Sequence, residues 1–303
     1  LWWGFTGEAA YVGNVGRGIV DRLDLNAATE LGAGLPGNDN AARPLFKKYG
    51  RSASVTTWIP VNAHHYNSLQ VKVDRRLRDL LITTSYTLSR AINYDDESGN
   101  ISTPADLSRS RGLAGFNRTH SFVQTFVWAI PFARRTDGVA RWALDGWQLS
   151  GLFARQSGTP LDITASATNL HAPGNTQRAN VTGTPRVLGN TGPGQLYFDK
   201  SVYSTPAATL ISATGVAYAP FGALTRNGSW LNGPGYLNLD ASIFKKFKFT
   251  ERIGGELRAD MFNALKHPNF NNPSTSLTSA TFGEINGTAS SPRLVRFGLR
   301  VSF

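Results

Sequence analysis

The chain has 303 residues, no cysteine and a formal net charge of +11 at pH 7. The lack of cysteine excludes disulfides, thiolate metal sites and cysteine nucleophiles, and no apolar run approaches the roughly 18 residues of a membrane-spanning helix. The basic residues are scattered, with short clusters only at 75–78 and 245–248. The charge therefore favours anionic lipid, including lipopolysaccharide, over nucleic acid as a neighbour.

The N-terminal part is predicted to begin with one strand over residues 3–13. The Asn-Val-Gly-Arg-Gly sequence at 14–18 supplies the turn chemistry expected to end that strand. A long polar stretch follows, and residues 52–61 are again rich in β-forming residues. Counting strand directions back from the C-terminus makes 52–61 a β-segment within a loop rather than a strand of the main sheet.

A β-hairpin is predicted next. Leu69, Val71 and Val73 alternate with polar residues within 66–77, and residues 80–94 alternate apolar with hydroxyl-bearing side chains. A tight turn at Arg78-Asp79 joins the two segments. Alternation of this kind predicts strands with one apolar and one polar face.

The middle of the chain contains two further predicted strands. The first covers 119–132, where the pattern does not decide which face is apolar, and the second covers 147–164. A moderate turn at 133–145 joins them. A very long stretch rich in Gly, Pro, Asn, Ser and Thr then runs over about 165–235 and predicts a loop.

Three predicted strands complete the chain, over 236–249, 255–265 and 293–303, with a turn at 250–252. In the last of them apolar and polar or small residues alternate to the final residue. Val295, Phe297, Leu299, Val301 and Phe303 share one side. A flat apolar edge of this kind is an aggregation hazard in water, whereas a membrane barrel pairs the edge and places the apolar side in lipid.

The connections alternate in length, and the long ones cover about 14–65, 94–118, 165–235 and 266–291. Domains that fold in water seldom carry several unstructured loops beyond about 15 residues, but bacterial outer-membrane barrels combine short turns at one end with long loops at the other. We therefore predict an all-β fold, a single antiparallel transmembrane β-barrel segment over 1–303 with about eight strands. A β-sandwich binding module is the alternative, because alternation alone fits both.

Aromatic residues near the predicted strand ends fit the interfacial girdles of a membrane barrel. They are Trp2, Trp3, Trp128, Phe132, Trp142, Trp147, Phe247 and Phe249. Packing in a β core is the alternative reading of this set.

Two groups of residues are candidate sites. If Leu257, Ala259 and Met261 face lipid, then Asp240, Glu256, Arg258 and Asp260 line the interior as a charge network. Opposite charges on neighbouring strands stabilise a sheet, so a purely structural network is the alternative to ligand or plug contact. The second group, Phe297, Leu299, Val301 and Phe303, forms a C-terminal strand that resembles the assembly signal of bacterial outer-membrane β-barrel proteins. The resemblance implies that this strand directs barrel assembly.

Motifs for chemistry are weak in this sequence. His64-His65 lacks a nearby third ligand, and Asp95-Asp96-Glu97 lacks the spacing of a calcium loop. Nucleophile-elbow, zinc-protease and phosphate-loop motifs do not occur. We expect no enzyme activity, catalytic residue, metal site or cofactor.

Several stretches together resemble the C-terminal barrel of TonB-dependent outer-membrane receptors, specifically the Oar-like group. They include YNSLQVKVDRRL, LLITTSYTLSRAINYDDESG, WQLSGLFARQSGTPLDIT, ELRADMFNALKHPNFNNPS and the terminal RFGLRVSF. The resemblance implies a barrel of about 22 strands, filled by a plug, of which this chain is a C-terminal arc. It also implies the barrel-assembly machinery, the plug and TonB as partners, the last two contributed from outside this chain.

The sequence thus predicts part of a bacterial outer-membrane receptor or transporter for an extracellular ligand that the residues do not identify. A passive porin, or a structural or adhesive surface barrel, would use the same wall without energy coupling. The long loops are the expected place for recognition, because large loops on a rigid scaffold commonly carry binding.

Overall fold

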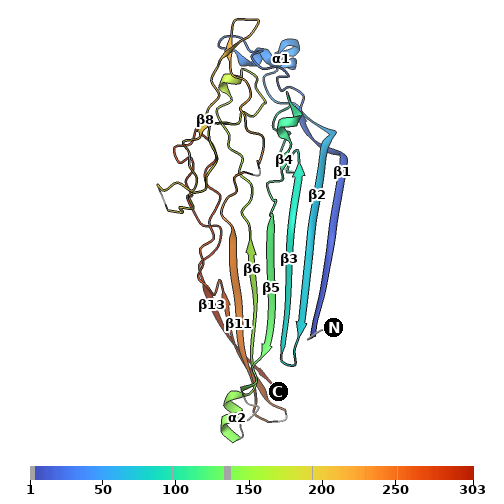
Figure 1. Ribbon diagram of the computed structural model, residues 1–303, viewed down its shortest axis with the longest axis vertical. Helices are drawn as coiled ribbons and strands as arrows, with labels where there is room; N and C mark the ends of the chain where they lie inside the picture. The colour runs from blue at the N-terminus through green and yellow to red at the C-terminus, as the bar shows by residue number, and fades with distance from the viewer. Residues whose placement is uncertain (1–3, 97–98, 133–137, 193, 229, 251) are drawn as a thin grey trace.

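The computed structural model describes residues 4–96, 99–132, 138–192, 194–228, 230–250 and 252–303. A tall sheet of antiparallel strands dominates the molecule, with folded loops above one end (Figure 1). Its eight long strands follow one another in the order β1-β2-β3-β5-β6-β11-β12-β13. They are β1 (Phe5–Asp24), β2 (Thr56–Arg76), β3 (Leu80–Asn93), β5 (His120–Ala129), β6 (Trp147–Gln156), β11 (Tyr236–Lys248), β12 (Gly254–Phe262) and β13 (Leu294–Ser302).

The remaining elements are short. β4 (Gly112–Leu113) pairs with β3, β7 (Asn180–Val181) with β8 (Tyr203–Ser204), and β9 (Leu210–Ile211) with β10 (Ala217–Tyr218). The helices are α1 (Pro44–Tyr49), α2 (Gly138–Leu144) and single 3-10 turns at Asp39–Ala42, Leu107–Ser110 and Thr168–Leu170. Within the described ranges, no helix has the length and hydropathy required to cross a bilayer.

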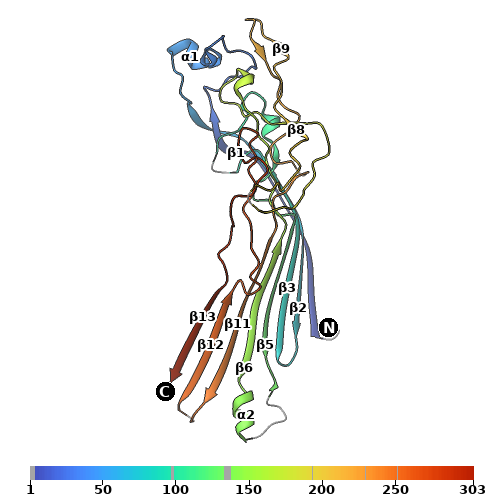
Figure 2. The same ribbon diagram turned by 90° about the vertical axis from the view of Figure 1, so that its left-hand side faces the viewer.

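The sheet is one curved layer, as Figure 2 shows from the side. Apart from two-stranded pairs in the loops, the described residues form no second sheet to pack against it. The sandwich alternative required two packed sheets, so the fold excludes it. β1 and β13 are the two ends of the strand order, and the whole sheet is an arc of an antiparallel barrel wall.

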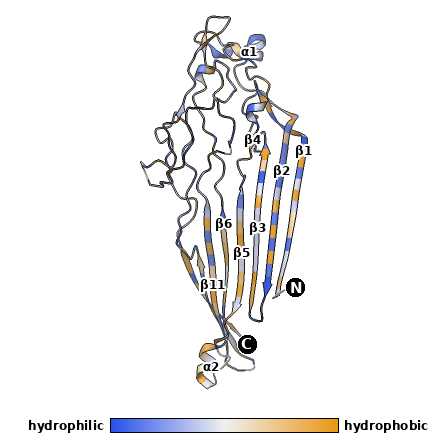
Figure 3. Cartoon of the chain, in the orientation of Figure 1, coloured by the Kyte–Doolittle hydropathy of each residue, from blue (hydrophilic) through white to orange (hydrophobic). Residues whose placement is uncertain are grey.

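Alternation divides the sheet into two faces, which we call the apolar and the polar face. Register places Val71 beside Tyr86 on the apolar face and Lys72 beside Ser85 on the polar face. Figure 3 shows the corresponding alternation of hydropathy along β2 and β3. Pairing also settles the face of β5, because Phe122 lies opposite Tyr86 and therefore belongs to the apolar face.

Two sequence predictions near the N-terminus were wrong. β1 continues through the predicted turn at 14–18 up to Asp24, with register shifts between Arg17 and Asp21. Gly18 has φ +64, so the glycine that suggested a turn instead accommodates a β-bulge. The separate segment predicted at 52–61 is largely the upper part of β2, which runs unbroken from Thr56 to Arg76.

Consequently the first long connection covers 25–55 rather than 14–65. The others span 94–119, 157–235 and 263–293, since β6 ends at Gln156, earlier than expected. We call the end of the sheet that carries these four long connections the loop end. The opposite, turn end has the β2–β3 turn, the connection that contains α2, and the β11–β12 turn. α2 was not predicted, and parts of the predicted turns at 133–145 and 250–252 lie outside the described residues.

The long connections fold on one another into a unit that we call the cap. Its larger core consists of Leu161, Ile163, Ala179, Tyr197, Phe198, Tyr203, Leu224, Leu231, Phe282 and Ile285. A smaller core of Ala28, Ala42, Leu170 and Ala172 joins the first connection to the third. A hydrogen bond from the backbone N–H of Thr176 to the carbonyl of Ser102 adds the second connection. Four segments far apart in sequence therefore build one ordered surface above the sheet (Figures 1 and 2).

Candidate functional surfaces

Asp260 is the centre of a hydrogen-bonded network on the polar face. Its Oδ1 accepts hydrogen bonds from Ser242 Oγ at 2.5 Å and from Arg258 Nε at 2.6 Å. Its Oδ2 accepts from Arg296 Nη2 at 3.0 Å. The carboxylate is buried while both arginines keep an exposed edge, so the network leaves cationic groups on the surface that a barrel turns toward its lumen.

The other predicted network residues are not joined to it. Asp240 Oδ1 accepts from Asn238 Nδ2 at 3.0 Å and from the backbone N–H of Asn263 at 2.9 Å. Glu256 lies opposite Lys246 on one side and Arg300 on the other in the strand register. The structure thus unites Arg258 and Asp260 and leaves Asp240 and Glu256 at separate positions.

Sequence reasoning missed Ser242 and Arg296 as members of this network. Both were recognisable in principle, because Ser242 and Arg296 are the register partners of Asp260 on the two flanking strands. The alternation placed all three on the polar side, but only the register shows that they lie side by side.

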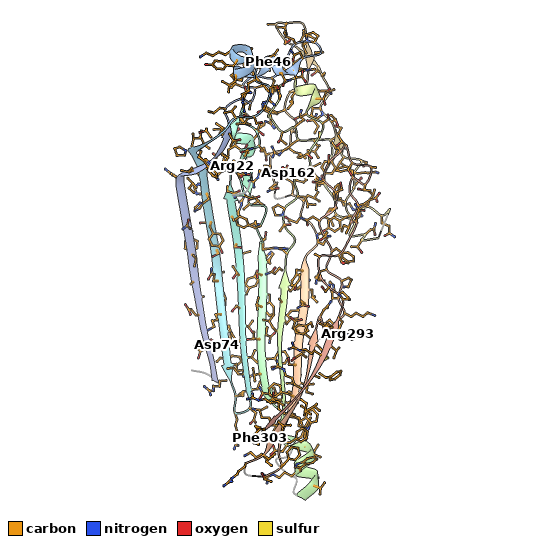
Figure 4. The ribbon with its side chains drawn as sticks, turned by 180° about the vertical axis from the view of Figure 1, so that it is seen from behind. Arg22, Phe46, Asp74, Asp162, Arg293 and Phe303 are labelled. Atoms are coloured by element: carbon orange, nitrogen blue, oxygen red, sulfur yellow. The ribbon has the colours of Figure 1, made fainter. Side chains whose placement is uncertain are left out.

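The predicted assembly strand occupies one end of the strand order. β13 pairs with β12 alone, and Phe297, Leu299 and Val301 project from the apolar face with 76%, 74% and 55% of their surface exposed. Phe303 follows the strand and is fully exposed. Figure 4 shows Phe303 at the turn end of the sheet.

Buried ion pairs fix the floor of the cap. Arg178, only 3% exposed, holds Asp162 through two parallel bonds, Nε to Oδ1 at 2.7 Å and Nη2 to Oδ2 at 2.9 Å. It also donates to Ser102 Oγ at 3.2 Å, which ties the second long connection to the third. Figure 4 places Asp162 where the cap meets the sheet.

A second buried arginine, Arg226, holds the connection that follows β3. It pairs with Asp96 at 2.5 Å and donates to Asn93 Oδ1 at 2.8 Å. Burial by itself would raise the pKa of Asp96, but hydrogen bonds from Asn93 and Arg226 outweigh it and hold the pKa below the ordinary 3.8. The neighbouring Asp95 has the opposite shift, since burial and then the charge of Asp21 raise its pKa above 3.8.

An aromatic cluster surrounds Lys245 at the turn end. The ammonium lies 5.1 Å from the ring centroids of Trp147 and Phe247 and 5.7 Å from that of Trp142. It donates to the backbone carbonyls of Trp142, at 3.0 Å, and Ala143 at the end of α2. This lysine is 4% exposed although it belongs to the apolar face.

The arrangement matches part of the predicted girdle. Phe249 stacks on Phe247 with ring centroids 6.0 Å apart, and Trp128 and Phe132 are exposed near the same end. Trp2 and Trp3 lie outside the described residues.

Comparisons with known proteins agree with this architecture. A family model described as "outer membrane beta barrel domain" matches residues 1–296. The crystal structure of the outer membrane transporter YddB from Escherichia coli is similar with a TM-score of 0.50 and 8% sequence identity. The match covers 98% of this chain and 30% of that one. A search of curated protein sequences gave no match.

Proposed function

Because the chain belongs to the outer membrane β-barrel domain family and forms part of a barrel wall in the bacterial outer membrane, we propose that it serves a TonB-dependent receptor of the Oar-like group. In this proposal the cap captures an extracellular ligand and the polar face lines the path of uptake. The wall and loops are the contribution of these residues, and the plug and the TonB contact come from elsewhere in the receptor.

The ordered cap is the observation that carries the proposal. The third and fourth long connections share one hydrophobic core, a smaller core joins the first to the third, and the Arg226–Asp96 ion pair joins the second to the third. The four connections therefore present a fixed surface rather than independent flexible loops. Fixed loops on a rigid scaffold suit recognition. The fold similarity to a protein described as an outer membrane transporter supports a wall of the receptor type.

The proposal first requires the cap to face the outside of the cell. These 303 residues contain no cysteine, so a single cysteine introduced among them labels one known position. The reactivity of the protein without the introduced cysteine is subtracted. We expect Ala213→Cys, in the exposed β9–β10 turn, to react in intact cells with a membrane-impermeant maleimide. Arg78→Cys, at the β2–β3 turn, is the matched control and should react only after the outer membrane is opened. The reverse pattern would refute the assignment of the cap to ligand capture.

Energy coupling is tested on the intact protein purified from outer membranes. A soluble periplasmic domain of TonB from the same organism should retain it on a column, and planar bilayers containing the protein should show no steady KCl conductance. Steady open-channel currents without TonB retention would instead establish a passive porin. Absence of both currents and TonB retention would favour a structural or adhesive barrel.

A further inference from the structure

Five successive strands each place a basic residue on the apolar face near the loop end. They are Arg17 in β1, His65 in β2, Arg90 in β3, His120 in β5 and Arg155 in β6. The three arginines are exposed, and within the described part of the chain none of them forms an ion pair. We call these five residues the basic row.

The strand register shows that the row is regular. The relevant pairs are Arg17 with Ala63, His65 with Ile92, Leu88 with His120, and Phe122 with Arg155. Each member therefore lies two residues away from the position opposite its neighbour, and always in the same direction. Side chains at such diagonal positions are near enough to act together.

The constant direction of this diagonal step is related to the tilt of strands in a barrel. Barrel strands tilt by roughly 35–45° from the axis, so residues at one height shift along each successive strand in the same direction. With strands about 4.8 Å apart, equal height corresponds to a shift of roughly one residue per strand. The two-residue step therefore carries the basic row around the circumference of the wall along a gradual slope.

The row lies along the upper margin of the apolar band. Two residues closer to the turn end on the same strands, the apolar face carries Leu88, Phe122 and Phe153. Beyond the row, β5 and β6 pass directly into long connections, whereas β1 and β2 continue upward to Asp24 and Thr56. Guanidinium groups facing lipid are strongly unfavourable at the membrane midplane and nearly neutral at its boundary. The row is therefore placed where hydrocarbon meets lipid headgroups.

A cavity of about 810 Å³ opens at one end of the row. His120, Arg155 and His267 line it together with the aromatic rings of Tyr86, Phe122 and Phe153. His120 Nδ1 is 2.7 Å from the hydroxyl of Tyr86. An arginine and two histidines beside aromatic rings are complementary to a molecule that joins phosphate to acyl chains.

We propose that the basic row and this cavity bind the phosphate groups of lipopolysaccharide in the outer leaflet of the outer membrane. Arginine suits this role because its fork of N–H donors binds phosphate oxygens in pairs. The site is on the outside of the wall, so it is independent of the ligand that the cap and lumen would take up. Binding of lipopolysaccharide at this site fixes the depth of the barrel in the membrane and surrounds this part of the wall with a specific lipid.

The test measures binding of phosphorylated lipid A to the intact protein in detergent. The triple variant Arg17→Gln, Arg90→Gln, Arg155→Gln should bind it roughly ten- to a hundredfold more weakly than the unaltered protein, because each arginine contributes to attraction by anionic headgroups. Lys47→Gln, Lys48→Gln, Arg51→Gln removes the same charge from the exposed part of the cap and is the matched control. It should leave the affinity unchanged.

Three results would overturn the proposal: equal affinity of both triple variants, equal affinity of the unaltered protein for lipid A without phosphates, or displacement of lipid A by millimolar inorganic phosphate. The last would indicate a free-phosphate site. Heat-dependent gel mobility verifies that each variant is folded. If the first triple variant fails to assemble, Arg155→Gln alone, within the cavity, is judged by the same criteria against Arg51→Gln.

Discussion

At the scale of single residues, Lys245 shows how an ionisable group is accommodated on a lipid-facing surface. Its ammonium donates to the carbonyls of Trp142 and Ala143 near the end of α2 and lies over three aromatic rings. Cations are favoured at helix C-termini and over aromatic faces. Lys245 therefore connects α2 to the wall and satisfies carbonyls that the end of a helix leaves free.

Replacing this lysine tests the connection. We expect Lys245→Met to destabilise the folded protein by about 1–3 kcal/mol, because it removes the hydrogen bonds from the ammonium to the carbonyls of Trp142 and Ala143 and its contacts with three aromatic rings. Urea unfolding in lipid vesicles measures the change. Lys246→Met is the matched control, since Lys246 is exposed on the opposite face and should cost little. Equal losses for both variants would show that the aromatic surroundings of Lys245 carry no special stability.

The candidate sites were only partly predictable from residues. Alternation assigned Arg258 and Asp260 to one face, because every second side chain of a strand points to the same side. The joining of Asp260 to Ser242 and Arg296 depends on register between strands, which a single strand pattern does not contain. The basic row escaped notice for the same reason, since its members are separated in sequence by long stretches and become neighbours only through four strand pairings.

At the scale of elements, the strands that alternate regularly were predicted well and the irregular ones were not. β3 and β13 lie close to their predicted bounds, whereas β1 and β2 extend beyond theirs to 20 and 21 residues. Spanning a membrane takes roughly 9–11 residues per strand, so the upper parts of this hairpin stand clear of the bilayer. Above the bilayer no side of a strand has to face lipid, so apolar and polar residues need not alternate. The pattern from which strands are predicted is therefore weaker there.

β13 provides the test at this scale. Deleting Phe303 should reduce the amount of folded protein in the outer membrane, because the exposed terminal ring and strand would no longer be recognised during assembly. Heat-dependent gel mobility of isolated membranes measures the folded fraction. Ser302→Ala, on the polar side of the same strand, should have little effect. Unchanged insertion of the deletion variant would rule out the terminal phenylalanine as an assembly signal.

At the scale of the whole molecule, acidity should affect the attachment of the cap in two opposite steps. The raised pKa of Asp95 means that its protonation relieves a cost, so stability is gained as the pH falls through that pKa. The lowered pKa of Asp96 means that its contribution is complete above 3.8 and is lost as the pH falls through the folded value. The attachment should therefore be firmest in mildly acidic solution and loosen below it.

Hydrogen exchange at Gly115 reports this equilibrium, because its N–H donates to Asp96. After correction for the intrinsic pH dependence, protection should rise on mild acidification and fall in stronger acid. Asp95→Asn should abolish the rise, and Asp96→Asn should abolish the fall. Protection that is flat with pH in the unaltered protein would contradict both assignments.

The cap has hydrophobic cores of its own, whereas the sheet is a single layer, and this difference yields the last prediction. Phe198 is completely buried within the cap and packs edge-on against Tyr203 and Phe282, with ring centroids 5.7 and 5.3 Å apart. Phe198→Ala should cost the cap roughly 3–5 kcal/mol while the wall still assembles, because the strands are held by their own ladder of hydrogen bonds.

The expected result is a folded barrel, by heat-dependent gel mobility, whose loops are cut by a protease added to intact cells. Ile211→Ala removes an apolar side chain from the exposed surface of the cap and should leave the loops resistant. If Phe198→Ala instead prevented barrel assembly, the cap would have to fold together with the wall. The loops would then be part of the folding unit rather than a recognition surface that varies on a constant scaffold.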